Sequence, residues 1–308
     1  MRTLTNDQVE AIRDVIDAGL TQQSGAALEK DIHLTQALFA LTTLENAEAL
    51  TFCGGTSLSK CFNIIDRMSE DADFKFHLPP ANSKNASAKE RSKFKAEVMA
   101  KLAEYDFEIE LNSTKDSNNY FQITASFEAA FAPDNALRDS ILLEFTHVET
   151  PPKSIKKEIH EFVWKAQLID APQGEVACLT LEQTLAEKTL SFLRRSLSRD
   201  APNFDPRIVR HLYDIEAIIS NTDIDIQDVY LHFEAAIAFD GARYAHESAQ
   251  LMELLERLKV EKQHYPALYA SFVEDLTVDG ENNFEKCWDT FVAIAGNLIA
   301  LKESNTAQ

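Results

Sequence analysis

A glycine-rich turn early in the chain has the residue types that bind phosphate groups. Residues 52–60 are FCGGTSLSK, so Gly54 and Gly55 directly follow a short apolar run. Glycines let a backbone approach a phosphate closely, and N–H groups at the start of a following helix attract its negative charge. We therefore predict a phosphate-binding turn at residues 54–57 and a helix over residues 57–65.

Two aspartates separated by one residue follow this turn. Asp71 and Asp73 alternate with apolar Ala72 and Phe74, and in a strand this period places both carboxylates on one face. Divalent cations such as Mg²⁺ or Mn²⁺ bind carboxylate and phosphate oxygens together. The turn and the aspartates in this order predict a site for a nucleoside triphosphate (NTP) with its cation, whereas the aspartate pair by itself is also typical of an acidic strand end.

These motifs need a small sheet to position them. Two helices precede it in the sequence: Thr5 is the expected N-cap of the first, and the second spans about Ala27–Leu44. The alternating, apolar and aromatic runs that follow predict a mixed sheet and an α+β fold. The predicted strands are Leu50–Cys53, Asp71–Phe76, Phe107–Leu111, Tyr120–Phe127 and Ile141–His147.

The pattern becomes almost entirely helical after a loop marked by Pro172 and Gly174. Apolar residues then recur at helical spacing over most of the remaining chain. We therefore predict two parts, a sheet-containing core with N-terminal helices over residues 1–172 and a helical lobe over residues 173–308. The expected helices in the lobe include 206–220, 226–239, 245–261, 266–276 and 284–302.

Composition excludes some classes of function. The 308 residues are 45% hydrophobic, which allows a substantial core, and the formal net charge is −20. A protein that covers nucleic acid uses a broad basic surface, so any contact with RNA must be local. The basic stretch Lys84–Lys95 is either a substrate-contacting segment or a solvated linker or helix face. The sequence shows neither a secretory leader pattern nor an apolar run of membrane-spanning length, so we expect a cytoplasmic protein without a membrane partner.

The glycine turn and the aspartates belong to a longer pattern. Residues 54–58 are GGTSL, and residues 67–73 are RMSEDAD, which contain Arg67, Ser69 and Glu70. This combination resembles the AbiEii/AbiGii family of nucleotidyltransferase toxins, a branch of the polymerase-beta-like nucleotidyltransferases. The resemblance implies metal binding by Asp71 and Asp73. It also implies nucleotide binding by Gly54, Gly55, Thr56, Ser57, Lys60, Arg67 and Ser69.

Two further matches to the family lie in the predicted helical lobe. The segment LAEK ends at Lys188, and the segment RHLYDI contains Asp214. The resemblance implies that activity depends on Asp214; a helix-supporting pair with Arg210, four residues earlier, is the alternative interpretation. Helical spacing places Lys188 and Arg195 on one stripe, and a lysine ammonium suits phosphate oxygens. We expect both cations to bind the nucleotide, with a basic solvated face as the alternative.

An E-K-D segment and one further carboxylate complete the candidates. Lys30 and Asp31 match a family segment that precedes the glycine turn, so they either border the site or are surface charges at a helix start. Glu144 lies between apolar neighbours in the predicted strand SILLEF, where a carboxylate needs a metal or a charged partner. Polymerase-beta-like enzymes take a third acidic residue from a strand beside the aspartate strand. The resemblance therefore implies that Glu144 is a catalytic metal ligand; an exposed edge-strand residue is the alternative.

For function, the resemblance implies a Mg²⁺-dependent nucleotidyltransferase with a polymerase-beta-like core and a helical lobe. Such a protein is the toxin of a toxin–antitoxin or phage-defence system. It transfers a nucleotide from an NTP to an acceptor such as the 3′ end of tRNA, and its protein partner is a cognate antitoxin. The implied catalytic residues are Asp71, Asp73, Glu144, Lys188 and Asp214. Two alternatives stay open, a nucleotidyltransferase that modifies a protein or small molecule and a nucleotide-binding module without catalysis.

Overall fold

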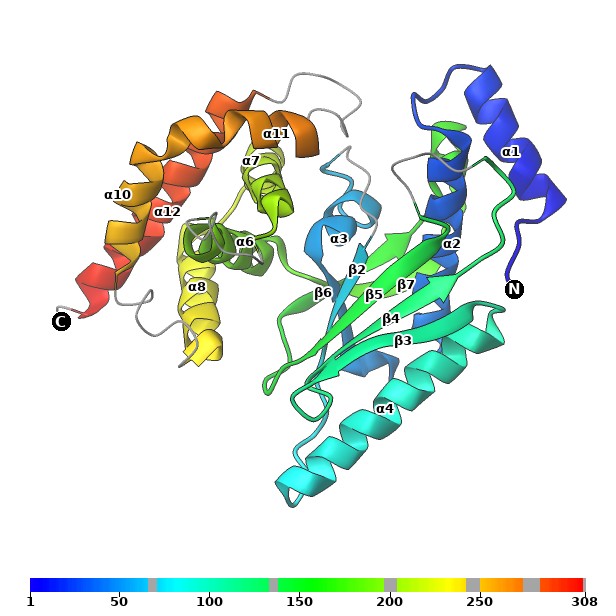
Figure 1. Ribbon diagram of the computed structural model, residues 1–308, viewed down its shortest axis with the longest axis horizontal. Coiled ribbons are helices and arrows are strands. Elements are labelled where there is room, and N and C mark those ends of the chain that lie inside the picture. The colour runs from blue at the N-terminus through cyan, green and yellow to red at the C-terminus, as the bar shows by residue number, and fades with distance from the viewer. Residues whose placement is uncertain (66–70, 133–137, 197–203, 242–249, 274–282, 307–308) are drawn as a thin grey trace. The chain divides into compact units, whose positions relative to one another are not determined.

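The computed structural model describes residues 1–65, 71–132, 138–196, 204–241, 250–273 and 283–306. The chain forms two compact units, the first made of Met1–Asn63 and Met68–Leu179 and the second made almost entirely of Thr180–Gln308. The first unit contains a seven-stranded mixed sheet with helices, and the described part of the second unit consists of helices (Figure 1). This arrangement of elements confirms the predicted α+β class.

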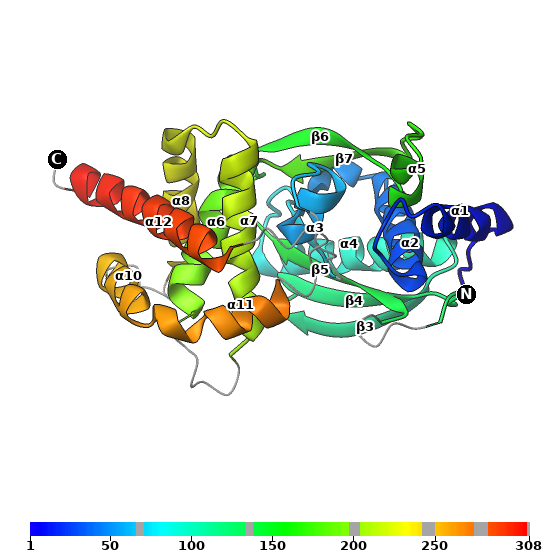
Figure 2. The same ribbon diagram turned by 90° about the horizontal axis from the view of Figure 1, so that it is seen from above.

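The sheet places the aspartate strand at its centre. Its strands are β1 (Leu50–Cys53), β2 (Asp71–Phe76), β3 (Glu108–Lys115), β4 (Tyr120–Ser126), β5 (Ser140–His147), β6 (Ser154–Ile159) and β7 (Gly174–Leu179). Their spatial order is β3-β4-β5-β2-β1-β7-β6, and the two edge strands are seen at opposite sides of the sheet in Figure 2. β2 pairs in parallel with β5, and β1 pairs in parallel with β7, while the other neighbours are antiparallel. The five predicted strands are therefore present, and β2 lies between β1 and β5.

Two strands differ from the sequence-based expectation. β6 lies outside every predicted strand, and β7 occupies residues 174–179, inside the region that was predicted to be helical. β6 is an edge strand whose sequence, SIKKEI, exposes most of its side chains, so the alternating apolar signal is weak. β7 is a short apolar run beside β1, and periodicity alone does not separate such a run from the start of a buried helix.

Two helices, α2 (Gly25–Thr42) and α4 (Lys84–Glu104), cover the apolar face of the sheet. Phenylalanine rings of neighbouring strands pack in this layer: the Phe74 ring centroid lies 5.2 Å from that of Phe52 and 5.0 Å from that of Phe145. Because side chains alternate along a strand, this row of rings fixes which residues face away from the core. The basic stretch Lys84–Lys95 forms the first half of α4 and is therefore part of a helix.

The described residues of the first unit also form three shorter α-helices, α1 (Asn6–Asp17), α3 (Gly54–Lys60) and α5 (Phe162–Ala166), and a 3-10 turn at Ala47–Ala49. Thr5 caps α1 as predicted, because its hydroxyl accepts the Gln8 N–H at 3.3 Å while the Gln8 side chain accepts the Thr5 N–H at 3.1 Å. The predicted helix over residues 57–65 is displaced toward the N-terminus. Gly54 and Gly55 are its first two residues, so the helix begins at the glycine turn itself rather than after it.

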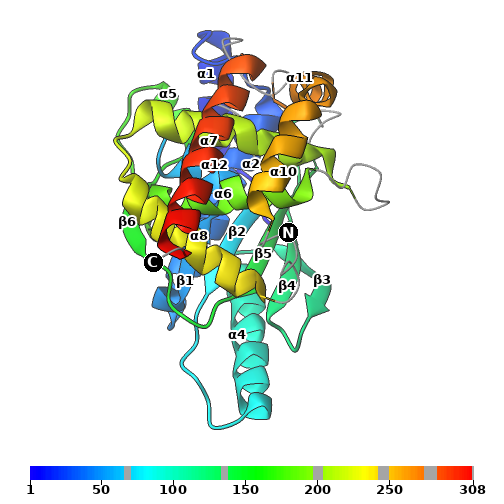
Figure 3. The ribbon, with the colours of Figure 1, turned by 90° about the vertical axis from the view of Figure 1, so that its left-hand side faces the viewer.

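The described residues of the second unit form α6 (Leu181–Arg195), α7 (Arg210–Asn221), α8 (Ile226–Asp240), α10 (Leu251–Val260), α11 (Pro266–Phe272) and α12 (Phe284–Thr306). α12 packs against α7 and α8 and runs beside α10, as Figure 3 shows. Parts of the predicted helices 245–261 and 266–276 lie outside the described residues. Among the helices that are described, none combines the length and the apolar composition needed to cross a bilayer.

Candidate active site

The polar face of the sheet brings the predicted carboxylates together. In β2, Ala72 and Phe74 are buried at 0% and 2% exposure, whereas Asp71 and Asp73 are half-buried on the opposite face. In the parallel pairing of β2 with β5, Asp73 is the register partner of Glu144. Neighbouring strands lie about 4.8 Å apart, so these two residues stand side by side on adjacent strands. The structure thus places Glu144 next to the aspartate pair.

β4 contributes two residues that were not among the sequence-based candidates. Gln122 is the register partner of Glu144 in the antiparallel pairing, and its Nε2 donates a 2.8 Å hydrogen bond to Glu144 Oε1. Tyr120 lies two residues earlier on the same face. Burial raises the pKa of its phenol, and so do the negative charge of Glu144, a hydrogen bond to Glu144, and the charges of Asp73 and Asp71. The alternation of polar and apolar residues in YFQITAS is the signal that could have placed both residues on this face.

The glycine turn packs directly against one of the aspartates. Gly54 has a φ of +79°, which favours glycine, and a Cβ at this position would lie 2.1 Å from Asp73 Oδ2. Thr56 Oγ1 donates a hydrogen bond to the backbone carbonyl of Asp71, and Ser57 Oγ donates one to the carbonyl of Gly54 at 2.9 Å. The phosphate-binding candidates and the metal-binding candidates are therefore parts of one local arrangement.

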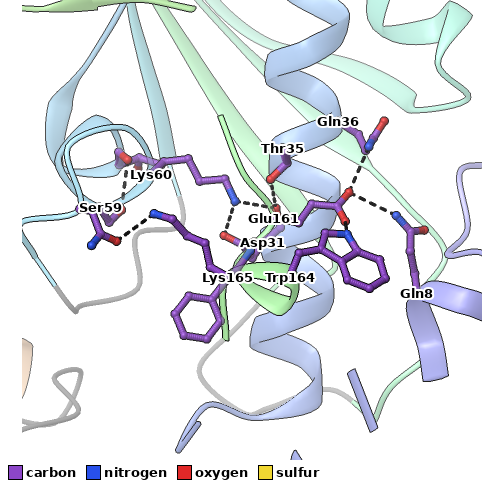
Figure 4. Close-up of polar contacts among 12 residues, drawn as sticks. Gln8, Asp31, Thr35, Gln36, Ser59, Lys60, Glu161, Trp164 and Lys165 are labelled. Atoms are coloured by element: carbon purple, nitrogen blue, oxygen red, sulfur yellow. Dashed lines mark hydrogen bonds and ion pairs between the residues drawn. The ribbon is translucent and has the colours of Figure 1, made fainter. Parts of the chain in front are cut away.

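The E-K-D segment of α2 is turned inward. Lys30 is 3% exposed, and its Nζ donates to the carbonyl of Arg138 at 3.2 Å, which excludes the surface-charge interpretation for this residue. Asp31 Oδ1 lies 2.5 Å from Lys60 Nζ, and the exposed fractions of the two side chains are 13% and 5%. Lys60, a predicted nucleotide-binding residue, thus lies in an ion pair at the C-terminal end of α3 (Figure 4).

The structure brings some of the candidate residues of the first unit together, places one of them apart, and leaves two outside the described residues. Those that it brings together are residues 54–57, Asp71, Asp73 and Glu144. Lys60 lies at the opposite end of α3 from the glycine turn. Arg67 and Ser69 lie outside the residues that the structure describes, so their binding of a nucleotide stays a prediction.

The candidates of the second unit include a buried ion pair between two helices. Lys188 Nζ of α6 lies 2.7 Å from Asp214 Oδ2 of α7, and the side chains are 9% and 0% exposed. Arg210, the alternative partner of Asp214, donates through Nε to a backbone carbonyl of α11 at 3.3 Å. Arg195 is exposed at the end of α6 and donates to a serine hydroxyl one turn earlier at 3.5 Å. Lys188 and Asp214, which the sequence motifs suggested separately, therefore form a pair whose charges compensate each other.

Comparison with known proteins first defines the class of fold. The structure matches that of MenT4, a nucleotidyltransferase toxin of Mycobacterium tuberculosis, with a TM-score of 0.50 and 18% sequence identity, over 97% of this chain and 99% of that chain. The sheet with its carboxylates and glycine turn therefore has the fold of a nucleotidyltransferase toxin.

The sequence then defines the family. The family described as "Nucleotidyl transferase AbiEii toxin, Type IV TA system" matches residues 36–293, and the chain belongs to it. No curated protein matches this sequence. The match confirms the family resemblance that the GGTSL, SEDAD, LAEK and RHLYDI motifs indicated.

Proposed function

We propose that this toxin-family nucleotidyltransferase depends on Mg²⁺ or Mn²⁺ and transfers a nucleoside monophosphate from an NTP to an acceptor such as the 3′ end of tRNA. The observation that carries the proposal is the register of β2 and β5, which puts Glu144 beside Asp73, next to the Gly54 turn. Three carboxylates on one half-buried face suit a hard divalent cation, which prefers oxygen ligands. Asp71, Asp73 and Glu144 would hold the metal.

The metal, when bound, would neutralise triphosphate charge and polarise the phosphoryl oxygens. The backbone of residues 54–57 would bind the phosphates, because glycine at position 54 leaves no side chain between the turn and Asp73. Lys188 and Arg195 as phosphate-binding cations, and Asp214 as a residue on which activity depends, remain part of the proposal on the strength of the family motifs.

The proposed reaction is an in-line displacement at the α-phosphorus. The acceptor hydroxyl oxygen forms a new bond to this phosphorus, and the bond from the phosphorus to the bridging oxygen of pyrophosphate breaks. The proton of the acceptor hydroxyl passes to the Glu144 carboxylate, and pyrophosphate leaves with the electron pair of the broken bond. Gln122, which donates to Oε1, would hold Glu144 in position for this proton transfer.

The family places the protein in a type IV toxin–antitoxin system. We therefore expect an antitoxin protein as its partner in the cell. In the absence of that partner, production of the active protein should slow growth, and the double variant Asp71→Ala, Asp73→Ala should relieve the effect.

Transfer of label tests the proposal. Each α-labelled NTP is incubated with Mg²⁺, total tRNA and total protein, and wild type is compared with the double variant Asp71→Ala, Asp73→Ala. Label on tRNA that depends on both aspartates supports the proposal and identifies the nucleotide. The matched control is Glu108→Ala, Glu110→Ala, which removes two exposed carboxylates from the edge strand β3 and should leave transfer unchanged.

The other outcomes are equally informative. Label on protein would move the acceptor from RNA to a polypeptide. Full activity in the aspartate double variant would contradict the metal assignment. Tight nucleotide binding without transfer to any acceptor would favour the alternative of a nucleotide-binding module without catalysis.

A further inference from the structure

Three consecutive charged residues of α2, Glu29, Lys30 and Asp31, reach three different segments of the first unit. Glu29 is 1% exposed, and its carboxylate accepts the N–H groups of Ala130 and Phe131 at 2.8 and 3.1 Å. Charged side chains are seldom buried unless specific partners compensate them. These contacts therefore fix particular segments to α2, and the contact that concerns the candidate site is that of Asp31.

Asp31 uses both of its carboxylate oxygens. Oδ1 forms the 2.5 Å ion pair with Lys60 Nζ, and Oδ2 accepts the N–H of Phe162, the first residue of α5, at 2.7 Å. The Lys60 ammonium also donates to the backbone carbonyl of Asp31 at 3.4 Å. Figure 4 shows the Lys60 side chain reaching from α3 to Asp31 on α2. Asp31 thus joins α2 to both α3 and α5.

The short helix α3 depends on such contacts. It has seven residues, and an isolated helix of this length is unstable in water. In its first turn, Thr56 donates to the carbonyl of Asp71 in β2; at its last residue, Lys60 binds Asp31 in α2. A cation at the C-terminus of a helix also interacts favourably with the helix dipole. The two ends of α3 are therefore attached to two different elements of the unit.

We infer that Asp31 is a positioning residue that acts through Lys60 to hold α3 and the glycine turn in place. Asp73 is part of the same arrangement, because Gly54 packs against its carboxylate. Lys60 then supports nucleotide binding through Asp31 rather than by touching a phosphate. The consequence for nucleotide affinity rests on the proposed function, whereas the positioning of α3 does not.

Hydrogen exchange measures the positioning without any nucleotide. We expect Asp31→Asn and Lys60→Met each to raise the exchange rate of the amides in residues 54–60 by about tenfold or more. Glu29→Gln is the matched control, because it alters a buried carboxylate of the same helix that does not contact α3. This control should speed exchange at residues 130–131 and leave residues 54–60 unchanged. Wild-type exchange of α3 in Asp31→Asn would overturn the inference.

A double-mutant cycle of nucleotide affinities distinguishes a positioning role of Lys60 from direct contact between Lys60 and the nucleotide. Calorimetry with non-hydrolysable NTP analogues and Mg²⁺ compares wild type, Asp31→Asn, Lys60→Met and the double variant. Each single variant should weaken nucleotide binding about tenfold. The double variant should bind the nucleotide at least as tightly as the weaker-binding single variant, because the two substitutions remove the same ion pair. The double variant also leaves no unpaired charge, so it should fold even where a single variant does not.

The opposite result in this cycle is equally clear. If Lys60→Met weakens binding by the same factor whether residue 31 is Asp or Asn, Lys60 contacts the nucleotide directly and the inference is wrong. A wild-type protein that binds no analogue and transfers no label contradicts the proposed function, and the exchange rates at residues 54–60 then still decide the role of Asp31. Normal affinity in all four proteins supports the nucleotide site and contradicts the inferred effect of Asp31 and Lys60 on nucleotide binding, and the exchange rates at residues 54–60 then decide whether Asp31 positions α3.

Discussion

The charged residues of the candidate site have opposite environments in the two units. In the sheet unit, Asp71, Asp73 and Glu144 stand on a half-buried face, and the strand register sets their spacing. In the helical unit, Lys188 and Asp214 are buried, and each compensates the charge of the other. Hydrogen-bonded neighbouring strands can hold like charges close together on a half-buried face. Charges that are buried between helices destabilise the fold unless each has an opposite charge beside it. We therefore expect substitutions in the first group to lower activity with little loss of stability. Substitutions in the second group should lower stability in addition to their effect on activity.

The largest expected effect on stability follows from removing one partner of the buried ion pair. Lys188→Met removes the ammonium that lies 2.7 Å from the Asp214 carboxylate, which is 0% exposed. Loss of one partner of a buried pair typically costs about 3–5 kcal/mol in the free energy of unfolding. Urea denaturation followed by circular dichroism measures this loss. Asp71→Ala, which changes a half-buried carboxylate of the sheet, should lower the free energy of unfolding much less.

A double variant sharpens this prediction. Lys188→Met, Asp214→Leu removes both charges, so it should be more stable than Lys188→Met alone. Equal stability of the single variant and the wild type would mean that the ion pair contributes nothing to folding, and the contrast between the two units would then be wrong.

The second largest effect concerns the glycine turn. In Gly54→Ala the new Cβ meets Asp73 Oδ2, and the alanine must adopt a φ of +79°, which costs about 1–2 kcal/mol. Displacement of a catalytic group by about an ångström can lower activity by about a hundredfold. We expect a large loss of nucleotide transfer together with a modest loss of stability. Gly296→Ala in α12, where a Cβ meets open space, is the control and should be neutral or stabilising.

A smaller effect is expected at the residue that orients Glu144. Gln122→Leu removes the 2.8 Å hydrogen bond to Oε1 and should weaken Mn²⁺ binding by about tenfold, a typical result of losing a contact to a metal ligand. Titration followed by electron paramagnetic resonance measures this affinity. Gln36→Leu removes a comparable bond from Gln36 Nε2 to Glu161 Oε1, 3.1 Å long, and should leave Mn²⁺ affinity unchanged. Equal loss in both variants would indicate a general change of the fold.

The smallest effect is a pH dependence of the sheet unit. His33 is 0% exposed and stacks on Phe127 with 4.0 Å between the ring centroids, and burial lowers its pKa below the ordinary 6.5. The unfolded chain therefore takes up a proton before the folded protein does, so the stability contributed by neutral His33 is complete above about pH 6.5 and declines as the pH falls below that value. Urea midpoints at several pH values measure the decline, which should be smaller in His33→Phe. The same pH dependence in the variant would assign the effect to other groups.

Much of the sheet and its carboxylate face could be predicted from the sequence, because the signals are local. The bounds of β1 and β2 agree with the predicted Leu50–Cys53 and Asp71–Phe76. Alternation within six residues is sufficient to place Asp71 and Asp73 on one face. The family motifs then indicated which acidic residue of a later strand to select, and the register places Glu144 beside Asp73.

The remaining features depend on contacts between residues far apart in the chain, which no local pattern encodes. The Asp31–Lys60 and Lys188–Asp214 ion pairs require the packing of separate helices before either partner can be identified. Gln122 is recognisable only when the register of β4 against β5 is known. β7 was missed for the same reason, since a short apolar run becomes a strand through its pairing with β1 and β6.

The position of β7 beside β1 has a consequence for synthesis of the protein. The glycine motif leaves the ribosome early, but β1 acquires its second neighbour only when the chain has been made as far as Leu179. Until then one edge of β1 lacks its partner strand, and unpaired strand edges promote association with other chains. An interrupted translation product would therefore carry the complete glycine and aspartate motifs without the complete sheet that holds them. The sheet that carries the site is therefore completed late in synthesis, well after the glycine and aspartate motifs have been made.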